Sequence, residues 1–236
     1  MNNLPTKKYL ITEVITLYLI QTVIIALLSL FGSSFSSPEG SSPEGFSGLV
    51  PALAGIIFII LPVIIMDKTD KPYNRYFLKF SNPLKDLPVI TVSAIVTWMP
   101  IIIFVLMFPA IWNISNPSFK LVWPLNYTQI AATHILIVAL PEEFFYRGYL
   151  LGRLDDIFTT RKRILGVSTG AGLFISSALF AIGHFIIVPN PSRLLVFFPS
   201  LLFGWLRYRQ KTITAPVIYH AGSNIFMDLF RASIGL

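Results

Sequence analysis

The sequence has no cysteine among its 236 residues and little charge of either sign. Without cysteine, disulfide bonds, thiolate metal sites and a cysteine nucleophile are excluded. Charged residues make up 12% of the chain, about half of what a soluble domain carries. Because 54% of the residues are hydrophobic and the mean hydropathy is +0.71, the scarcity of charge predicts an all-α, polytopic membrane protein.

Long apolar runs take the place of the missing charge, each near the length of about 20 residues that a spanning helix needs. The net charge of +7 could indicate a nucleic-acid partner, but the basic residues lie in the polar segments between these runs. With the N-terminus inside, 14 of the 18 Lys and Arg residues fall in inner segments, as in cytoplasmic loops. We therefore expect a multi-pass integral membrane protein with a cytoplasmic N-terminus and no nucleic-acid partner. The predicted helical bundle has about seven transmembrane helices, at 9–31, 49–66, 88–112, 128–150, 168–188, 193–206 and 212–232.

The first apolar run is longer than the core of a signal peptide and is followed by no A-x-A cleavage site, so it predicts a retained helix. The next loop repeats the pentapeptide SSPEG in tandem at 36–45, a composition typical of a flexible insertion. After the fourth run, the segment from Arg153 to Arg163 is expected to form a short surface helix.

Two adjacent carboxylates and an arginine follow the uncharged apolar run 130–140. Charges beside hydrocarbon are costly, so they face a partner or a water-filled cavity and are often functional. On a helix, Glu143 and Arg147 are four residues apart and can pair, whereas Glu142 is rotated by about 100° from Glu143. The spacing predicts one paired carboxylate and one free neighbour. An ion cluster that closes a transmembrane helix is the simpler alternative.

All three histidines lie within predicted spans, and two of them are candidates for a functional site. His184 belongs to the fifth predicted span, and His220 lies four residues before Asn224 in the seventh, so that this pair shares one helix face. Gly222 and Ser223 beside them would let another helix approach closely. Each of these polar residues could instead serve only as a hydrogen-bond partner between helices.

Three further polar residues within spans have less defined expectations. His134 is expected to be structural. Glu13, near the inner end of the first span, can extend to the interface, and neither Glu13 nor Asp228 has a predicted role. From the span boundaries, His184 would lie deeper in the membrane than Glu142, which is expected near the inner end of its span.

Four of these residues come from three different spans and would together form one site. A carboxylate such as Glu142 beside an imidazole such as His184 is a pair that activates water. A second imidazole and an amide, His220 and Asn224, can donate hydrogen bonds to a developing oxyanion. These parts suffice for general-base hydrolysis of a peptide bond, although Ser223 stays open as a nucleophile.

Four motifs stand in a fixed order within the apolar spans, and together they resemble the CPBP family of intramembrane proteases. That family includes the CAAX prenyl endopeptidases and the bacterial Abi or bacteriocin-processing proteins. Ser200 stands near a position where the family often has glycine. The motifs are EExxxR at 142–147 followed by Gly148, FxxxH at 180–184, a linking segment at 203–217, and HxxxN at 220–224.

The resemblance implies a role for each matching residue. Glu142, helped by His184, would activate the attacking water, and Glu143 would pair with Arg147 to hold that helix end. The remaining pair, His220 and Asn224, would form the oxyanion hole. No cofactor is expected, but two histidines and a glutamate could also ligate zinc, so a zinc-dependent protease is the mechanistic alternative.

We therefore predict a glutamate-type intramembrane endopeptidase in a prokaryotic plasma membrane. Its partners would be the lipid bilayer and a membrane-anchored or lipid-modified peptide substrate; no oligomeric state is predicted. Residues 1–236 would form a single membrane domain, with variable N-terminal helices over 1–125 and a catalytic helical core over 126–236. Competing hypotheses are a non-proteolytic scaffold or immunity protein of the same fold, and a proton-coupled transporter.

Overall fold

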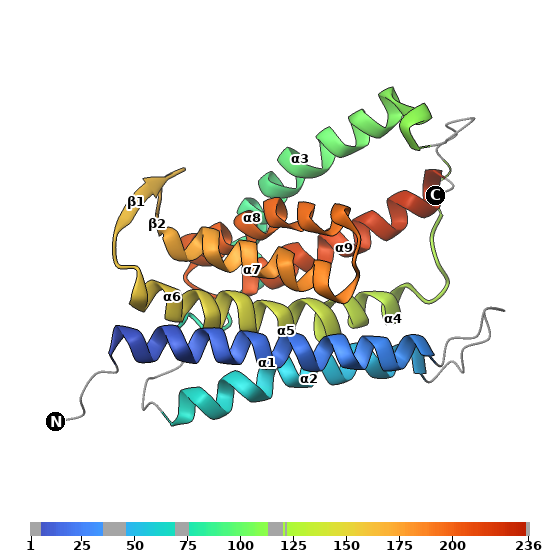
Figure 1. Cartoon of the computed structure of the whole chain (residues 1–236). Helices are drawn as coiled ribbons and strands as arrows, with labels where there is room; N and C mark the ends of the chain where they lie inside the picture. The colour runs from blue at the N-terminus through green and yellow to red at the C-terminus, as the bar shows by residue number, and fades with distance from the viewer. Residues whose placement is uncertain (1–5, 35–45, 69–75, 113–119, 121, 235–236) are drawn as a thin grey trace.

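The computed structural model describes residues 6–34, 46–68, 76–112, 120 and 122–234, and helices dominate it (Figure 1). This confirms the predicted all-α helical bundle, to which one small β-hairpin is added; the SSPEG repeat lies outside the described residues. The elements are α1 (Lys7–Ser34), α2 (Phe46–Asp67), α3 (Pro83–Met107), the 3-10 turn η2 (Pro109–Trp112), α4 (Tyr127–Ala132), the π-helix η3 (Thr133–Ala139), α5 (Leu140–Glu143), the π-helix η4 (Phe144–Leu150), α6 (Leu151–Ile157), β1 (Arg161–Ile164), β2 (Val167–Gly170), α7 (Ala171–Ile187), the 3-10 turn η5 (Pro191–Val196), α8 (Phe197–Gln210) and α9 (Thr214–Ile234).

The three N-terminal helices α1, α2 and α3 are 28, 22 and 25 residues long. At a rise of about 1.5 Å per residue, each exceeds the hydrocarbon core of a bilayer, which is about 30 Å thick. Within the described residues, these three are the helices that combine the length and the apolar composition to cross a membrane. Their many exposed leucines, isoleucines and valines suit a lipid environment.

A composite helix runs without a break from Tyr127 to Ile157 and carries the two central glutamates. Its α-helical segment α5 (Leu140–Glu143) lies between two π-helical segments, η3 and η4. π-Helical turns are rare and are frequent at functional sites. A helix therefore exists where the fourth span is predicted, but it extends beyond residue 150 and is π-helical on both sides of Leu140–Glu143.

The helices α7 and α8 form a hairpin that is too short to cross a membrane. They have 17 and 14 residues, or about 25 and 21 Å at the usual helical rise. Figure 1 shows the turn between them stopping short of the end of the bundle that the last turn of α9 reaches. The fifth and sixth predicted spans thus form a short hairpin among longer helices.

A two-stranded β-hairpin replaces part of the predicted surface helix. The helix α6 ends at Ile157, and β1 pairs antiparallel with β2. The prediction of a helix as far as Arg163 is wrong, because Leu165 and Gly166 take positive φ angles of 47° and 79° and form a tight two-residue turn. Since β2 occupies 167–170, α7 begins at Ala171, three residues later than its predicted span.

Buried charges connect the helices at the end of the bundle where α1 begins, the basic end of the bundle. Glu13 is 5% exposed, receives a hydrogen bond from the Tyr149 hydroxyl at 2.6 Å, and pairs with the buried Arg153 at 2.8 Å. The expectation that Glu13 extends to the interface is wrong, because α1 packs against α6 and buried Arg153 requires a counterion.

Near the other end, His134 Nε2 lies 2.8 Å from Asp228 Oδ2, a contact between η3 and α9 that fits a structural role.

Candidate active site

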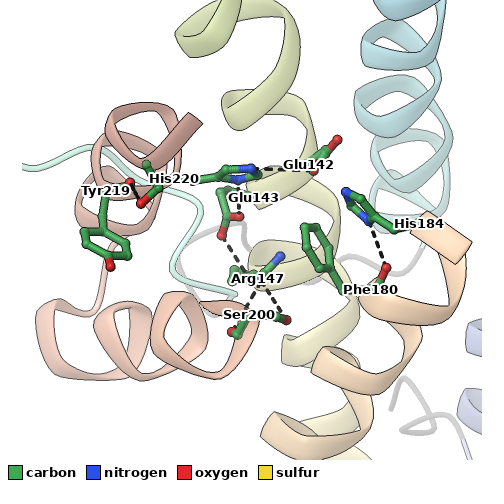
Figure 2. A network of polar contacts seen from close by, with 9 residues as sticks. Glu142, Glu143, Arg147, Phe180, His184, Ser200, Tyr219 and His220 are labelled. Atoms are coloured by element: carbon green, nitrogen blue, oxygen red, sulfur yellow. Dashed lines mark hydrogen bonds and ion pairs between the residues drawn. The ribbon is translucent and has the colours of Figure 1, made fainter. Parts of the chain in front are cut away.

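Glu143 lies at the centre of a buried polar network (Figure 2). Its Oε2 is 3.2 Å from Arg147 Nε, which confirms the predicted pair across one helical turn. Its Oε1 accepts a hydrogen bond of 2.9 Å from Nδ1 of His220, 77 residues away on α9. The second contact was not predicted, and it makes Glu143 a bridge between two helices.

Arg147 is held from three sides. Its Nη2 donates to the Ser200 hydroxyl at 2.9 Å and to the Ser200 carbonyl oxygen at 3.3 Å. Its guanidinium lies 4.4 Å from the ring centroid of Phe180 and 4.9 Å from that of Phe203. Cation–π contacts of this kind gain strength away from water. The arginine therefore has a fixed position, and it fixes the carboxylate of Glu143 in turn.

His220 is the point at which both glutamates meet. Its Nε2 is 3.9 Å from Glu142 Oε2, while Nδ1 is bound by Glu143. The imidazole stacks on Phe203, with ring centroids 4.7 Å apart and an angle of 17° between the planes. Because Nδ1 donates to Glu143, a second donation through Nε2 requires a proton on both ring nitrogens.

Glu142 is the less committed of the two carboxylates. Its side chain is 16% exposed, against 0% for Glu143. Within the described part of the chain, Glu142 Oε2 is buried and has no hydrogen-bond partner. Buried polar atoms in folded proteins nearly always have a donor or acceptor. This oxygen is therefore positioned to bind a small polar molecule, in agreement with the prediction of one free carboxylate.

His184 lies near the end of α7, with Nδ1 2.9 Å from the carbonyl oxygen of Phe180. A carbonyl oxygen only accepts, so Nδ1 carries the hydrogen and Nε2 of the neutral ring has a free lone pair. In the view of Figure 2, His184 lies on the side of Glu142 away from His220. Among the described residues, no ion pair joins His184 directly to a glutamate, so any cooperation with Glu142 requires a bridging molecule.

A cavity of about 650 Å³ adjoins these groups, with walls from α3, α7, η5, α8 and α9. Most of its lining is apolar, and the polar exceptions include His184, His220 and Asn224. Glu142 adjoins the cavity through its neighbour His220. Three residues along the walls, Val96, Leu195 and Phe198, are more than half exposed on the outer surface. The cavity is therefore continuous with the apolar surface of the bundle.

The polar residues lie at a common depth. Glu142 is near the middle of the helical stretch Tyr127–Ile157, and His184 is in the last turn of the short helix α7. The expectation that Glu142 lies near the inner end of its helix is wrong, because the helix continues beyond residue 150 to Ile157. This longer helix, with the late start of α7, removes the expected mismatch in depth between Glu142 and His184.

Asn224 lines the same cavity as His220, as expected from their spacing on α9. Between them, Ser223 donates its hydroxyl hydrogen to the Tyr219 carbonyl oxygen at 2.8 Å and accepts from Trp98 Nε1 at 3.3 Å. The hydroxyl hydrogen thus points to a main-chain carbonyl rather than to a base, which does not suit a nucleophile. A Cβ at Gly222 would lie 3.6 Å from the Trp98 ring, an ordinary van der Waals distance, so the packing of Trp98 against α9 does not require a glycine there.

Three residues that contact the site were not predicted from the sequence. Ser200 was noted only as a departure from a family pattern, yet it binds Arg147. Phe203 stacks on His220, and Trp98 of α3 covers the α9 face. Phe203 begins the linking motif, which was the available signal; nothing local marked Trp98, because its partner is 125 residues away.

The zinc alternative requires at least three converging ligands. In the part of the chain that the structure describes, no group of three or more His, Cys, Asp or Glu side chains is arranged to hold a metal ion. The Nδ1 of His220 donates to Glu143 and the Nδ1 of His184 to a main-chain carbonyl, which are the contacts that metal-ligating histidines commonly make and which leave Nε2 of each ring for another partner. Zinc therefore stays the mechanistic alternative, to be tested with a chelator.

Fold and site together define an integral membrane helical bundle with a buried Glu–His–Arg network beside an apolar cavity, the parts of a hydrolase that works within the bilayer. A comparison with protein-family models matches residues 98–226 to the family "Type II CAAX prenyl endopeptidase Rce1-like". This match covers more than half of the chain and all the site residues named above from Trp98 to Asn224, so the chain belongs to this family of proteases, which hydrolyse peptide bonds. Searches of curated proteins and of solved structures give no match.

Proposed function

We propose that this endopeptidase uses a glutamate as its general base, and that Glu142 is that glutamate. One observation carries the proposal: the two adjacent carboxylates have different partners. Glu143 is held by Arg147 at 3.2 Å and by His220 at 2.9 Å, whereas Glu142 lies 3.9 Å from His220 Nε2 and its Oε2 has no hydrogen-bond partner in the described part of the chain. An ionised carboxylate with an open acceptor position can take a proton from water.

The reaction follows from these positions. A water molecule bound by Glu142 gives up a proton as its oxygen adds to the carbonyl carbon of the scissile peptide bond. The free Nε2 of His184 accepts the second hydrogen of the same water and orients it. When the C–N bond of the tetrahedral intermediate breaks, the proton passes from Glu142 to the leaving amine. The products are a carboxylic acid and an amine, without a covalent enzyme intermediate.

His220 and Asn224 would stabilise the oxyanion of that intermediate. Both lie on one wall of the cavity, and their side chains can supply an imidazole N–H and an amide N–H. His220 acts here with hydrogen on both ring nitrogens, one directed to Glu143 and one to the substrate. Donors held in place by a buried network need no reorganisation as charge develops, which is the main advantage of an oxyanion hole.

The substrate class follows from the cavity and from the family name. The cavity is mostly apolar and continuous with the lipid-facing surface between α3 and α8. A peptide carrying a prenyl or other lipid chain, or anchored by an apolar segment, would reach the site from within the bilayer. The basic end of the bundle, where α1 begins, would face the cytoplasm of a prokaryotic cell.

The test uses purified protein in detergent with two peptides of the same sequence, one prenylated and one not. Wild type and Glu142→Gln are compared by mass spectrometry of the products, with and without a strong zinc chelator. We expect chelator-resistant cleavage of the prenylated peptide by wild type and none by the variant. Chelator-sensitive cleavage would replace the glutamate mechanism with a zinc mechanism. Cleavage that persists in the variant would reject Glu142 as the base.

A further inference from the structure

A second cavity, of about 710 Å³, lies at the end of the bundle that carries the β-hairpin. It is bounded by the end of α6, the hairpin and the end of α8, and it shares no residue with the active-site cavity. Four of its lining residues are basic and two are acidic: Arg161, Arg207, Arg209 and Lys211 against Asp155 and Asp156. A concave surface with this excess of basic residues attracts anions.

The charge of Asp155 is already shared between two of the arginines. Its Oδ1 lies 3.0 Å from Arg161 Nη1, and its Oδ2 lies 3.1 Å from Arg207 Nη1. The Tyr208 hydroxyl also donates to Oδ1 at 2.6 Å. Burial, with the nearby Asp155, raises the pKa of Tyr208, so the hydroxyl keeps its proton and remains a donor. One carboxylate holding two guanidinium groups leaves this cluster positive.

Arg207 lines the cavity and keeps one N–H donor without a hydrogen-bond partner among the described residues. It is 1% exposed, and within the described residues its Nε is buried without a hydrogen-bond partner, although its other nitrogens bind Asp155 and the Tyr76 carbonyl. Arg209 lies over the Trp205 ring at 5.2 Å, and Lys211 is exposed at the end of α8. Buried and exposed cations thus surround one hollow.

The hairpin beside this cavity has an apolar tip next to basic residues. Ile164 and Leu165 are 38% and 80% exposed, and they follow Arg161, Lys162 and Arg163. Leu165 has a φ of 47°, a conformation that non-glycine residues seldom adopt outside Asn and Asp. Figure 1 shows the hairpin projecting sideways from the end of the bundle, across the direction of the helices. An apolar tip beside basic side chains is the combination that favours binding at a lipid–water boundary.

We propose that this cavity binds the phosphate of an anionic phospholipid headgroup, and that the hairpin tip enters the adjacent acyl region. The four basic side chains would contact the phosphate, and Ile164 and Leu165 would contact the first carbons of the lipid tails. Basic clusters beside membrane-spanning segments bind anionic lipids through the same combination of charge and apolar contact. The exposed apolar tip is the reason to assign a lipid rather than free phosphate, because free phosphate has no apolar part that could contact the tip.

The test measures the thermal stabilisation of the full-length protein in detergent. Phosphatidylglycerol, phosphatidylcholine and inorganic phosphate are titrated in separate arms. Wild type is compared with Arg209→Gln/Lys211→Gln, and the matched control Lys120→Gln/Arg231→Gln removes two bases outside this cavity. We expect phosphatidylglycerol alone to stabilise wild type and the control, with its affinity reduced about tenfold in the cavity variant. Equal affinity in both double variants would reject the site, and equal stabilisation by phosphatidylcholine would reject anion recognition.

A second variant separates the two sources of phosphate. Leu165→Asn suits the positive φ, so it leaves the fold of the hairpin intact, and it removes the more exposed of the two apolar residues at the tip. We expect it to weaken the binding of phosphatidylglycerol while the melting temperature without lipid is unchanged or raised. If inorganic phosphate stabilises wild type as strongly as the lipid does, or if Leu165→Asn binds the lipid normally, the ligand is not a lipid headgroup held by the hairpin.

Discussion

Two buried glutamates, Glu13 and Glu143, have closely similar surroundings but different roles, one in the fold and one in the proposed active site. Each is nearly or fully inaccessible, each pairs with a buried arginine, and each accepts a second hydrogen bond from a ring-bearing side chain. For Glu13 these partners are Arg153 and Tyr149, and for Glu143 they are Arg147 and His220. Burial and pairing alone therefore do not distinguish a functional carboxylate from a structural one.

The difference lies in the neighbours of each network. Beside Glu143 stands Glu142, with an unpartnered oxygen among the described residues, and the shared partner His220 lines a cavity. Glu13 Oε2 is likewise buried without a hydrogen-bond partner among the described residues, so an open acceptor position alone does not separate the two networks. The separating feature is His220, which contacts both Glu142 and Glu143 and lines the cavity, whereas Tyr149 and Arg153 join Glu13 of α1 to the composite helix.

The largest expected effect is that of Glu142→Gln. The amide keeps the size of the side chain but removes the base, so we expect the rate of peptide cleavage to fall by about 1,000-fold. The melting temperature should change little, since Glu142 has no close hydrogen bond to lose. A single-turnover assay with the prenylated peptide measures the rate, and a variant that retains a tenth of wild-type activity would contradict the assignment.

The next prediction sets Glu143→Gln against Glu13→Gln. Each change leaves a buried arginine without its counterion, so each should cost about 3–5 kcal/mol of unfolding free energy. Thermal or denaturant unfolding in detergent measures this loss. Only Glu143→Gln should also lower the cleavage rate of the folded fraction, because it releases His220 from its position. Equal activity losses in the two variants, after correction for folded protein, would remove the distinction between the networks.

Asn224→Ala tests the opposite wall of the site. If the amide donates to the oxyanion, its removal should lower kcat by about 100-fold and leave KM nearly unchanged. The same variant should unfold like wild type, since Asn224 is only partly buried and makes no side-chain hydrogen bond among the described residues. A rise in KM at constant kcat would instead assign Asn224 to substrate binding.

The smallest effect should come from Ser223→Ala. This hydroxyl hydrogen bonds only to the Tyr219 carbonyl and the Trp98 indole, so its loss should cost about 1 kcal/mol of stability. Cleavage should continue at nearly the wild-type rate. Complete inactivation of a well-folded Ser223→Ala protein would favour a serine nucleophile over the glutamate base.

Local spacing explains what could be predicted of the site. Glu143 and Arg147 are one helical turn apart, so their pairing follows from any helix through that segment. The contact between Glu143 and His220 joins residues 77 positions apart and depends on how α9 packs against the composite helix. Ser200 and Trp98 are long-range contacts of the same kind. The division into an N-terminal part over 1–125 and a core over 126–236 stays a prediction, although Trp98 of α3 contributes to the cavity region.

The sequence by itself determined the membrane bundle, the motif residues and the local ion pair. Apolar runs of this length are stable as helices in lipid. Side chains one turn apart on a helix contact each other in any tertiary structure. Tertiary structure decided the short α7–α8 hairpin, the β-hairpin with its basic cavity, and the depth shared by Glu142, His184 and His220. It also decided which glutamate is occupied and which keeps an open acceptor position. These features depend on contacts between distant segments, whose energies no single stretch of sequence contains.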